Sequence, residues 1–292
     1  MTNYYLTKNN LAGIIVLYNP GNDTIENVKS YINFLSHLYI IDNSETPDLH
    51  LINSLKNIGG NISYTAFGNN LGIAKALNEG CNLARLGNYD WVLTMDQDSF
   101  FETGVFFDQA FNREYLNTAI IAASYNAIHF NPQKSDRSGF TRVDYVITSG
   151  NILNIDAWLV LGGFTEKLFI DEVDNDFCIR AKNKGFNVLM SNEIFLKHRL
   201  GDAYNVRHVL TGKSLTLTKH SPLRVYYIFR NNFYLFKKYT FSNLNFVIDR
   251  VKNLIVMLVK ITLYFPDKAI YFKYIFKALK DFAIGRYGKY VN

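Results

Sequence analysis

The stretch "WVLTMDQDSFF" (residues 91–101) runs a hydrophobic segment directly into two aspartates, Asp96 and Asp98, that are separated by one residue. The hydrophobic part has the length and composition of a buried β-strand. In extended backbone, residues i and i+2 point to the same side, so the two carboxylates can share one cation. Hard divalent cations such as Mg²⁺ prefer carboxylate oxygens. The stretch therefore predicts either a metal site at the end of a strand or an ordinary polar turn.

Strand and helix patterns alternate through the first two-thirds of the chain. This alternation predicts an α/β fold of three layers with a mostly parallel sheet. In such folds ligands bind at the carboxyl ends of the strands, where three of the predicted strands carry polar pairs. This points to a nucleotide-binding cleft. The predicted strands are 12–20, 39–44, 62–67 and 90–96, the predicted helices are 24–38, 51–55 and 68–87, and the polar pairs are Tyr18-Asn19, Asp42-Asn43 and Asp96-Asp98.

The charge of the chain is unevenly distributed. The formal net charge is +6, but residues 211–292 hold 15 of the 31 Lys and Arg residues and only 3 of the 25 Asp and Glu residues. An acidic body with a basic, aromatic-rich tail indicates two roles. We place a boundary near residue 215, with a catalytic domain over 1–215 and a helical extension over 216–292. Within the first domain, the donor half is expected at about 12–100 and the acceptor half at about 101–215.

Composition and cysteine content limit the class of protein. Nearly half of the residues are hydrophobic, which excludes an intrinsically disordered chain. Cys81 and Cys178 have no metal-ligand spacing and are expected to be buried thiols in a reducing compartment. The N-terminus lacks the pattern of a signal peptide. The hydrophobic stretch 254–265 is shorter than the roughly 20 residues that a membrane-spanning helix needs. We therefore expect a cytoplasmic protein without a membrane span.

Four groups of residues, in this order, resemble the inverting glycosyltransferases of family 2, which have the GT-A fold. They are "VLYNP" (16–20), "IDNS" (41–44), "NNLGIAKALNEG" (69–80) and "DQD" (96–98). The resemblance implies a nucleotide-sugar donor and a Mg²⁺ or Mn²⁺ ion. It implies donor-binding roles for Tyr18, Asn19, Asp42, Asn43, Asn70, Gly72, Asp96 and Gln97.

The chemistry of these residue types agrees with the resemblance. The Asp42 carboxylate can accept a hydrogen bond from the imide N–H of uracil or thymine, although an acid in a solvated turn has the same sequence pattern. Asn70 and Gly72 open a helix whose free N–H groups and positive dipole end suit an anionic ligand. Ordinary helix capping by Asn70 is the alternative.

The resemblance continues through "TSGNILNIDAWLVLGGFTEKLFIDEVDNDFCIRAKNKG" (148–185), in which four acids fall within six residues. The dipole of the following helix accounts for one or two acids near its start. Mutual repulsion raises carboxyl pKa values, which suits a proton acceptor. The resemblance places the catalytic base at Asp174, although Val173 stands where many members have Glu. It implies that Ser149, Gly150, Asn151 and Asp171 line the acceptor or the sugar, whereas a strand-terminal turn would also explain the first three.

Two more groups extend the resemblance towards the C-terminus. In "LKHRLGD" (196–202) the family uses a histidine as a metal ligand, so His198 is expected to join Asp98 and Asp96 around the metal; otherwise a lone histidine is structural or exposed. The run "HSPLRVYYIFRNNFYLFKK" (220–238) resembles the rhamnosyltransferase branch, which uses dTDP-L-rhamnose. Arg224 and Arg230 are expected to clamp a diphosphate or an anionic acceptor, with a cationic helix face over the core as the alternative.

Residues 239–292 lie outside the resemblance. Ile248, Val251, Ile255 and Leu258 share one helix face, and Lys and Arg follow among Tyr and Phe. A basic amphipathic helix with aromatic residues can lie on an anionic bilayer surface. Packing against its own domain, or against a second copy in a homodimer, is the alternative. No motif that reads nucleic-acid bases accompanies the charge, so nucleic acid is not an expected partner.

Together these features predict an inverting, metal-dependent glycosyltransferase at the inner face of the cell membrane. We expect it to transfer L-rhamnose from dTDP-L-rhamnose to a saccharide or lipid-linked saccharide in cell-surface polysaccharide synthesis. Two alternatives stay open: a transferase for another UDP- or dTDP-sugar, and a catalytically inactive module that serves as a membrane-surface scaffold or saccharide-binding partner. A phosphatase is disfavoured because three strands precede "DQDS". A sugar nucleotidyltransferase is disfavoured because "LYNPGND" is not a Gly-rich basic loop.

Overall fold

The chain folds into two compact units. The computed structural model describes residues 5–125, 139–198, 203–207, 209 and 211–291. The first unit is α/β and contains residues 1–166 and 173–199, and the second is helical and contains residues 167–172 and 200–292. The second unit thus begins before the boundary expected near residue 215, because Tyr204 and Val206, in the hairpin before the helices, pack against their hydrophobic core.

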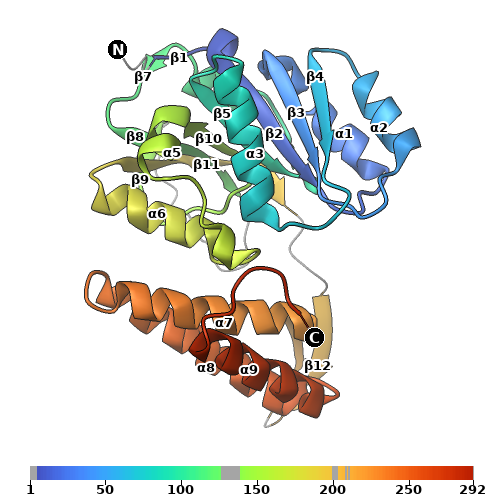
Figure 1. Ribbon diagram of the computed structural model, residues 1–292, viewed down its shortest axis with the longest axis vertical. Coiled ribbons are helices and arrows are strands. Elements are labelled where there is room, and N and C mark those ends of the chain that lie inside the picture. The colour runs from blue at the N-terminus through green and yellow to red at the C-terminus, as the bar shows by residue number, and fades with distance from the viewer. Residues whose placement is uncertain (1–4, 126–138, 199–202, 208, 210, 292) are drawn as a thin grey trace. The chain divides into compact units, whose positions relative to one another are not determined.

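The described part of the α/β unit contains a sheet of nine strands in the order β4-β3-β2-β5-β10-β8-β11-β6, with β9 paired to β11 (Figure 1). Strands β4, β3, β2 and β5 are parallel, as predicted. Beyond them the sheet is mixed, because β10 runs antiparallel to both of its neighbours. The strands are β2 Leu11–Leu17, β3 His37–Asp42, β4 Ile62–Ala66, β5 Trp91–Asp96, β6 Ser99–Phe101, β8 Thr118–Tyr125, β9 Phe140–Arg142, β10 Asn151–Asn154 and β11 Asn187–His198; β1 Tyr5–Leu6 and β7 Arg113–Glu114 form a separate pair.

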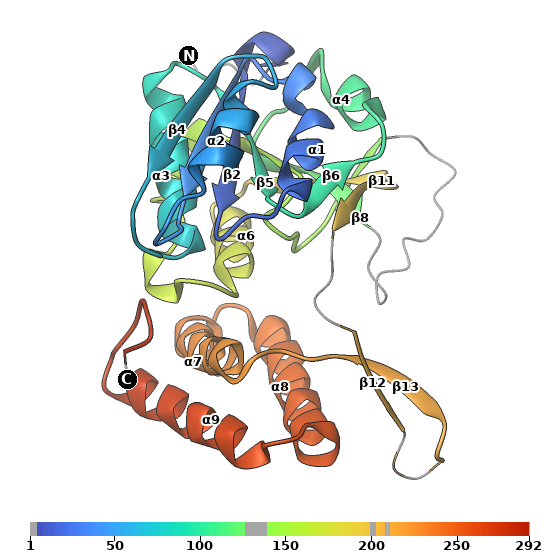
Figure 2. The same cartoon turned by 90° about the vertical axis from the view of Figure 1, so that its right-hand side faces the viewer.

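Helices cover both faces of this sheet, which gives the predicted three layers (Figures 1 and 2). They are α1 Asp23–Lys29, α2 Leu49–Lys56, α3 Ile73–Leu86, α4 Val105–Ala110, α5 Ile155–Val160 and α6 Val173–Asn183, with short 3-10 turns at Lys8–Asn10, Ile32–Phe34 and Glu166–Leu168. The helix expected over 24–38 is shorter than predicted. The Ser30 hydroxyl donates to the carbonyl of Asn27, and such local side-chain bonds compete with helix continuation.

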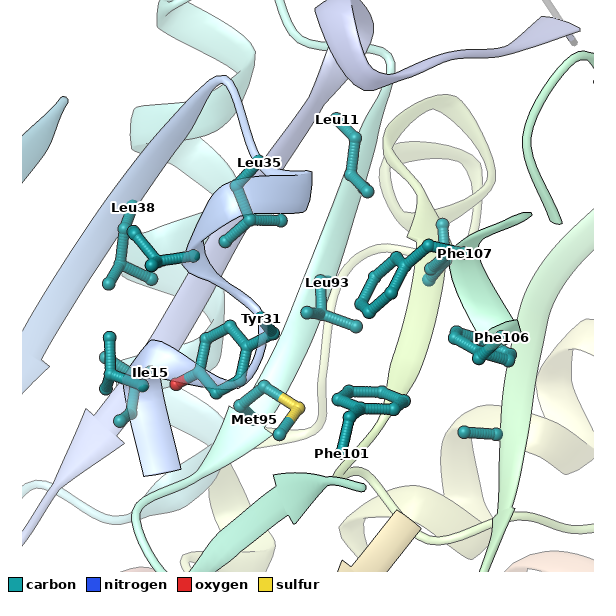
Figure 3. Packing of buried hydrophobic residues seen from close by; sticks show 14 of the residues in the cluster. Leu11, Ile15, Tyr31, Leu35, Leu38, Leu93, Met95, Phe101, Phe106 and Phe107 are labelled. Carbon is teal, nitrogen blue, oxygen red and sulfur yellow. The ribbon is translucent and has the colours of Figure 1, made fainter. Parts of the chain in front are cut away.

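Alternation along β2 directs neighbouring residues to opposite layers. Ile15 belongs to the core cluster that α1, α2 and α4 cover, whereas Ile14 lies against Gly80 of α3, where a Cβ atom would come within 2.6 Å of it. Figure 3 shows the first cluster, with Phe101 and Phe107 packed beside β5 and their ring centroids 4.9 Å apart. This buried layer gives β5 a fixed position, and the acidic pair follows at its carboxyl end.

The helical unit consists of three helices preceded by a hairpin: β12 Ala203–Arg207, β13 Ser214–Thr218, α7 Pro222–Tyr239, α8 Leu244–Tyr264 and α9 Lys268–Ala283. Ser221 caps α7 by accepting a hydrogen bond from the backbone N–H of Arg224, and Pro222 occupies the first helical position. In the part of the chain that the structure describes, no helix is both long and hydrophobic enough to span a bilayer.

Candidate functional site

The polar strand ends predicted from the sequence meet at one edge of the sheet. The parallel register pairs Leu17 with Asp42 and Val16 with Asp96, so the residues that follow β2, β3 and β5 are neighbours. Gln97 joins two of these ends. Its side-chain oxygen accepts from the backbone N–H of Tyr18 at 2.8 Å, and its amide group donates to the Tyr18 carbonyl at 3.1 Å. Gln97 therefore braces the backbone next to the ring of Tyr18, which is 45% exposed.

The expected role of Asp42 needs a correction. Its side chain is fully buried, and its two oxygens accept from the backbone N–H of Ser44 at 2.8 Å and from the Tyr64 hydroxyl at 2.9 Å. Asn43 is also buried and accepts from the backbone N–H of Leu71 at 3.0 Å. In this structure both side chains bond to neighbouring segments and do not face a ligand. Asn19, by contrast, is exposed, has a left-handed φ of 46°, and donates its N–H to the Ser44 hydroxyl.

Helix α3 starts at the turn of Asn70 and Gly72, as the sequence predicted. Gly72 is the N-cap residue, with φ 90°, a conformation that favours glycine. Asn70 does not cap the helix; it accepts from the N–H of Gly72 at 3.0 Å and shapes the turn before it. Among the described residues, no side chain caps α3. Its first N–H groups therefore suit an anion, such as a diphosphate.

The predicted sugar-lining turn lies against the acidic end of β5. The backbone N–H of Asp96 donates to the Ser149 hydroxyl at 3.1 Å, and that of Gly150 donates to the Thr94 carbonyl at 2.8 Å. Asn151 then pairs with Thr94 across β10 and β5. Gly150 has φ 77°, and a Cβ atom there would lie 2.8 Å from the side chain of Leu196, so only glycine fits.

The backbones of two segments that carry predicted metal ligands lie next to each other. His198 pairs with Ser99 across β11 and β6, and Ser99 directly follows Asp98. The side chain of His198 lies outside the described residues. Among the side chains that are described, no group of three His, Cys, Asp or Glu residues could hold a metal ion. Carboxylate and imidazole groups nevertheless suit Mg²⁺ or Mn²⁺, and the strand pairing brings their backbones together.

Asp174 reaches the same region from the first turn of α6. It is partly exposed, and its carboxylate accepts from the backbone N–H of Asn175 at 2.8 Å. It lines a small cavity of about 10 Å³ together with Thr94, Thr148 and Asn151. The Thr94 hydroxyl donates to the Thr148 carbonyl at 2.6 Å and fixes this wall. Thr94 and Thr148 were missed by the sequence analysis, because a threonine within a strand carries no sign of lining a cavity.

The other acid of the α6 turn has a structural role. Asp176 is fully buried and accepts from the Thr165 hydroxyl at 2.6 Å and from Arg180 at 2.8 Å. Cys178, two residues further on, is buried, as the sequence analysis expected. Burial raises the pKa of its thiol to about 12, and the negative charge of Asp174 contributes to the increase. Of the two acids on α6, Asp176 is thus buried and paired, whereas Asp174 is partly exposed.

Asp171 and the two predicted arginine clamps lie in the helical unit. Asp171 accepts from Arg224, which is half exposed, at 3.0 and 3.2 Å. Arg230 is fully buried, so the predicted clamp role is wrong for this residue. Its guanidinium donates to the carbonyls of Leu168 and Gly288 and lies over the rings of three tyrosines, which leaves no face for a ligand; the three are Tyr226, Tyr227 and Tyr287.

Comparisons with known proteins agree with this geometry. Residues 14–142 match the family described as Glycosyl transferase family 2. The dTDP-rhamnosyl transferase RfbF of Shigella flexneri is 26% identical over 247 residues, which cover 78% of this chain and 80% of that protein.

Two solved structures share the fold. The S. aureus TarS 1–349 complex with UDP-GlcNAc matches with a TM-score of 0.51 and 15% identity, over 94% of this chain and 72% of that one. GalNAc-T7 with UDP, GalNAc and Mn²⁺ matches with a TM-score of 0.55 and 14% identity, over 66% of this chain and 44% of that longer chain. The chain is therefore similar to glycosyltransferase family 2 over residues 14–142 and to a dTDP-rhamnosyl transferase over most of its length, and it has the GT-A fold.

Proposed function

We propose that this glycosyltransferase is inverting and dependent on a divalent metal, and that it moves L-rhamnose from dTDP-L-rhamnose to a hydroxyl of a saccharide or lipid-linked saccharide in cell-surface polysaccharide synthesis. The observation that carries the proposal is the meeting of the β5 end that bears Asp96 with the turn of Ser149 at one edge of the sheet, where the Ser149 hydroxyl accepts from the backbone N–H of Asp96. The similarity to RfbF supports rhamnose as the sugar. The structural neighbours were solved in complex with UDP-GlcNAc, or with UDP, GalNAc and Mn²⁺, which supports a nucleotide-sugar donor and a metal.

In this reaction Asp174 is the general base. Its carboxylate takes the proton from the acceptor hydroxyl, and the resulting oxygen attacks the anomeric carbon from the side opposite the diphosphate. The new glycosidic C–O bond forms as the C–O bond to the diphosphate breaks, and the electron pair leaves with the nucleoside diphosphate. The configuration inverts, and no covalent enzyme intermediate is needed.

The remaining residues of the edge bind and orient. The open N–H groups at the start of α3, next to Asn70 and Gly72, face the diphosphate and stabilise its growing charge. The exposed ring of Tyr18 and the backbone at Asn19 contact the nucleoside. Ser149, Gly150 and Asn151 contact the sugar or the acceptor. Asp98, His198 and Asp96 would hold the metal, which neutralises the leaving diphosphate when bound.

The same proposal includes a location. We infer a cytoplasmic protein with its helical unit on the inner face of the cell membrane, where a lipid-linked acceptor would be presented. The basic, aromatic composition of residues 211–292 supports this location. Homodimerisation through the helical unit is the competing arrangement.

A donor panel tests the proposal. Purified protein is incubated with dTDP-L-rhamnose, dTDP-glucose, UDP-glucose and UDP-GlcNAc, and the released nucleoside diphosphate is measured with Mg²⁺, with Mn²⁺ and with a chelator. We expect release from dTDP-L-rhamnose above the others, and its loss with the chelator. Preference for a UDP-sugar would identify another transferase. No release from any donor, with donor binding intact, would support the inactive scaffold instead.

A further inference from the structure

Helix α8 of the helical unit has two hydrophobic faces. One face is buried within the unit and contains Val247, Leu254 and Ile261. On the other face, large aliphatic side chains recur every three or four residues and are 38–55% exposed: Leu244, Ile248, Val251, Ile255 and Val259. We call this set the α8 stripe. At a rise of 1.5 Å per residue, it is about 22 Å long.

Such a row differs from the usual scatter of exposed aliphatic residues. Single exposed leucines or valines are common on soluble proteins, whereas a continuous apolar surface marks a contact site. The sequence pattern placed Ile248, Val251, Ile255 and Leu258 on one helix face and did not identify what covers that face. In the structure Leu258 packs against the core, whereas the other three are exposed, so the core of the unit does not account for the α8 stripe.

The surroundings of the stripe are basic. Residues 211–292 contain 15 Lys and Arg residues against 3 Asp and no Glu. Two of these aspartates are already neutralised, since Asp249 pairs with Lys252 at 3.1 Å and the buried Asp281 pairs with Lys277 at 3.1 Å. Exposed lysines therefore outnumber free acids in the helical unit. On α9 they include Lys268, Lys273 and Lys280.

We propose that the α8 stripe docks on an anionic lipid bilayer, with α8 lying in the plane of the headgroups and the lysines facing lipid phosphates. A bilayer surface with acidic lipids offers an apolar phase and negative charge together, which matches both features of the unit. A second copy that docks symmetrically, through its own helical unit, would bring an equally basic surface to the stripe, so charge opposes that arrangement. The inference rests on the proposed peripheral location, names the surface responsible for it, and does not require sugar transfer.

Co-sedimentation of the full chain with vesicles tests the inference. We expect binding to vesicles of phosphatidylglycerol and phosphatidylcholine, weakened at high salt, and much less binding to phosphatidylcholine alone. The double variant Ile248→Gln/Ile255→Gln removes apolar surface without adding charge, and should lower the bound fraction by about tenfold or more. The matched control is Leu159→Gln/Val160→Gln on α5 of the α/β unit, where two aliphatic side chains are 55% and 61% exposed. This control should bind like the unmodified chain.

A charge variant measures the electrostatic contribution to vesicle binding. Replacing Lys268 and Lys273 by Gln should weaken binding by about fivefold for each lysine near the surface. All of these side chains are exposed, so urea unfolding should give unchanged stability, and donor turnover should persist in every variant.

Two results would overturn the inference. One is undiminished vesicle binding by the Ile248→Gln/Ile255→Gln variant. The other is a dimer in light scattering that this variant converts to a monomer, which would assign the stripe to a second copy of the chain. Because vesicle binding and donor turnover are measured separately, failure of the docking surface is distinguishable from failure of the proposed transfer reaction.

Discussion

The two units differ in the kind of side chain that they expose. In the α/β unit, hydrophobic side chains fill the layers around the sheet, the acids Asp42 and Asp176 are buried and paired, and Asp96 and Asp174 stay partly exposed. In the helical unit, the cation of Arg230 and the acid Asp281 are fully buried, while α8 exposes a row of aliphatic residues. Both units thus bury paired polar groups, but acids are exposed for chemistry in one unit and a row of hydrophobic groups is exposed for contact in the other.

The largest effect that this comparison predicts is the loss of catalysis in Asp174→Asn. The amide cannot accept the proton of the acceptor hydroxyl, so turnover should fall by roughly 100- to 10,000-fold. Donor affinity, measured by calorimetry, should change little, because the base does not bind the diphosphate. Asp156→Asn, at an exposed acid in the first turn of α5, is the matched control and should keep full turnover. Equal turnover in Asp174→Asn would remove the base from the mechanism.

Arg230→Met tests the other side of the comparison. The variant removes the Arg230 donor to the Gly288 carbonyl and one of the two donors to the Leu168 carbonyl, and it removes the cation from its three tyrosine rings. The free energy of unfolding should fall by about 3 kcal/mol, as measured with urea. The control Arg286→Met, at a half-exposed residue 3.8 Å from Asp281, should cost less than about 1 kcal/mol. A ligand clamp would give the reverse result for Arg230: weaker donor binding with stability intact.

These residues also show what the sequence could reveal. The strand ends, the open start of α3 and the acidic turn at Asp174 were predictable, because a polar residue after a hydrophobic strand is a local signal. The buried state of Asp42 was not, since its partner Tyr64 comes from the neighbouring strand β4. The role of Arg230 likewise depends on Leu168, which lies 62 residues earlier in the chain. A pattern of hydrophobic residues along a helix also does not tell which of two faces is covered.

The variant Asn78→Ala tests how much the structural polar bonds of the α/β unit contribute to its stability. Asn78 on α3 accepts from Trp158 Nε1 at 3.1 Å and from the N–H of Phe164 at 2.8 Å, and donates to the Phe164 carbonyl at 2.9 Å. Its loss leaves these groups unpaired and should cost about 2 kcal/mol of unfolding free energy. Asn82→Ala, at an exposed position one turn further on, should be close to neutral. If Asn78→Ala lowered the unfolding free energy as much as Arg230→Met, buried polar side chains would stabilise both units equally, and the units would differ only in the groups that they expose.

The smallest predicted effect is on the pH dependence of stability. In the helical unit, burial and the neighbouring charge of Arg224 lower the pKa of His220, with Asp171 acting in the opposite direction and Lys260 adding to the decrease. The unfolded chain, whose histidine pKa is about 6.5, therefore binds more protons than the folded chain. The stability associated with neutral His220 is therefore present above a pH of about 6.5, the histidine pKa in the unfolded chain. It is lost as the pH falls from there towards the lower pKa of His220 in the folded chain.

Replacing His220 by Gln removes the titrating group, so the unfolding free energy should decline less between neutral pH and the acidic side of this window. Urea unfolding across this window measures the slope, and His50→Gln, at an exposed histidine of the α/β unit, is the control. A residual slope is expected, because burial also lowers the pKa of His37 in the α/β unit. A steeper decline in His220→Gln would mean that the protonated ring is stabilised by Asp171, and that the acid outweighs burial and the two cations.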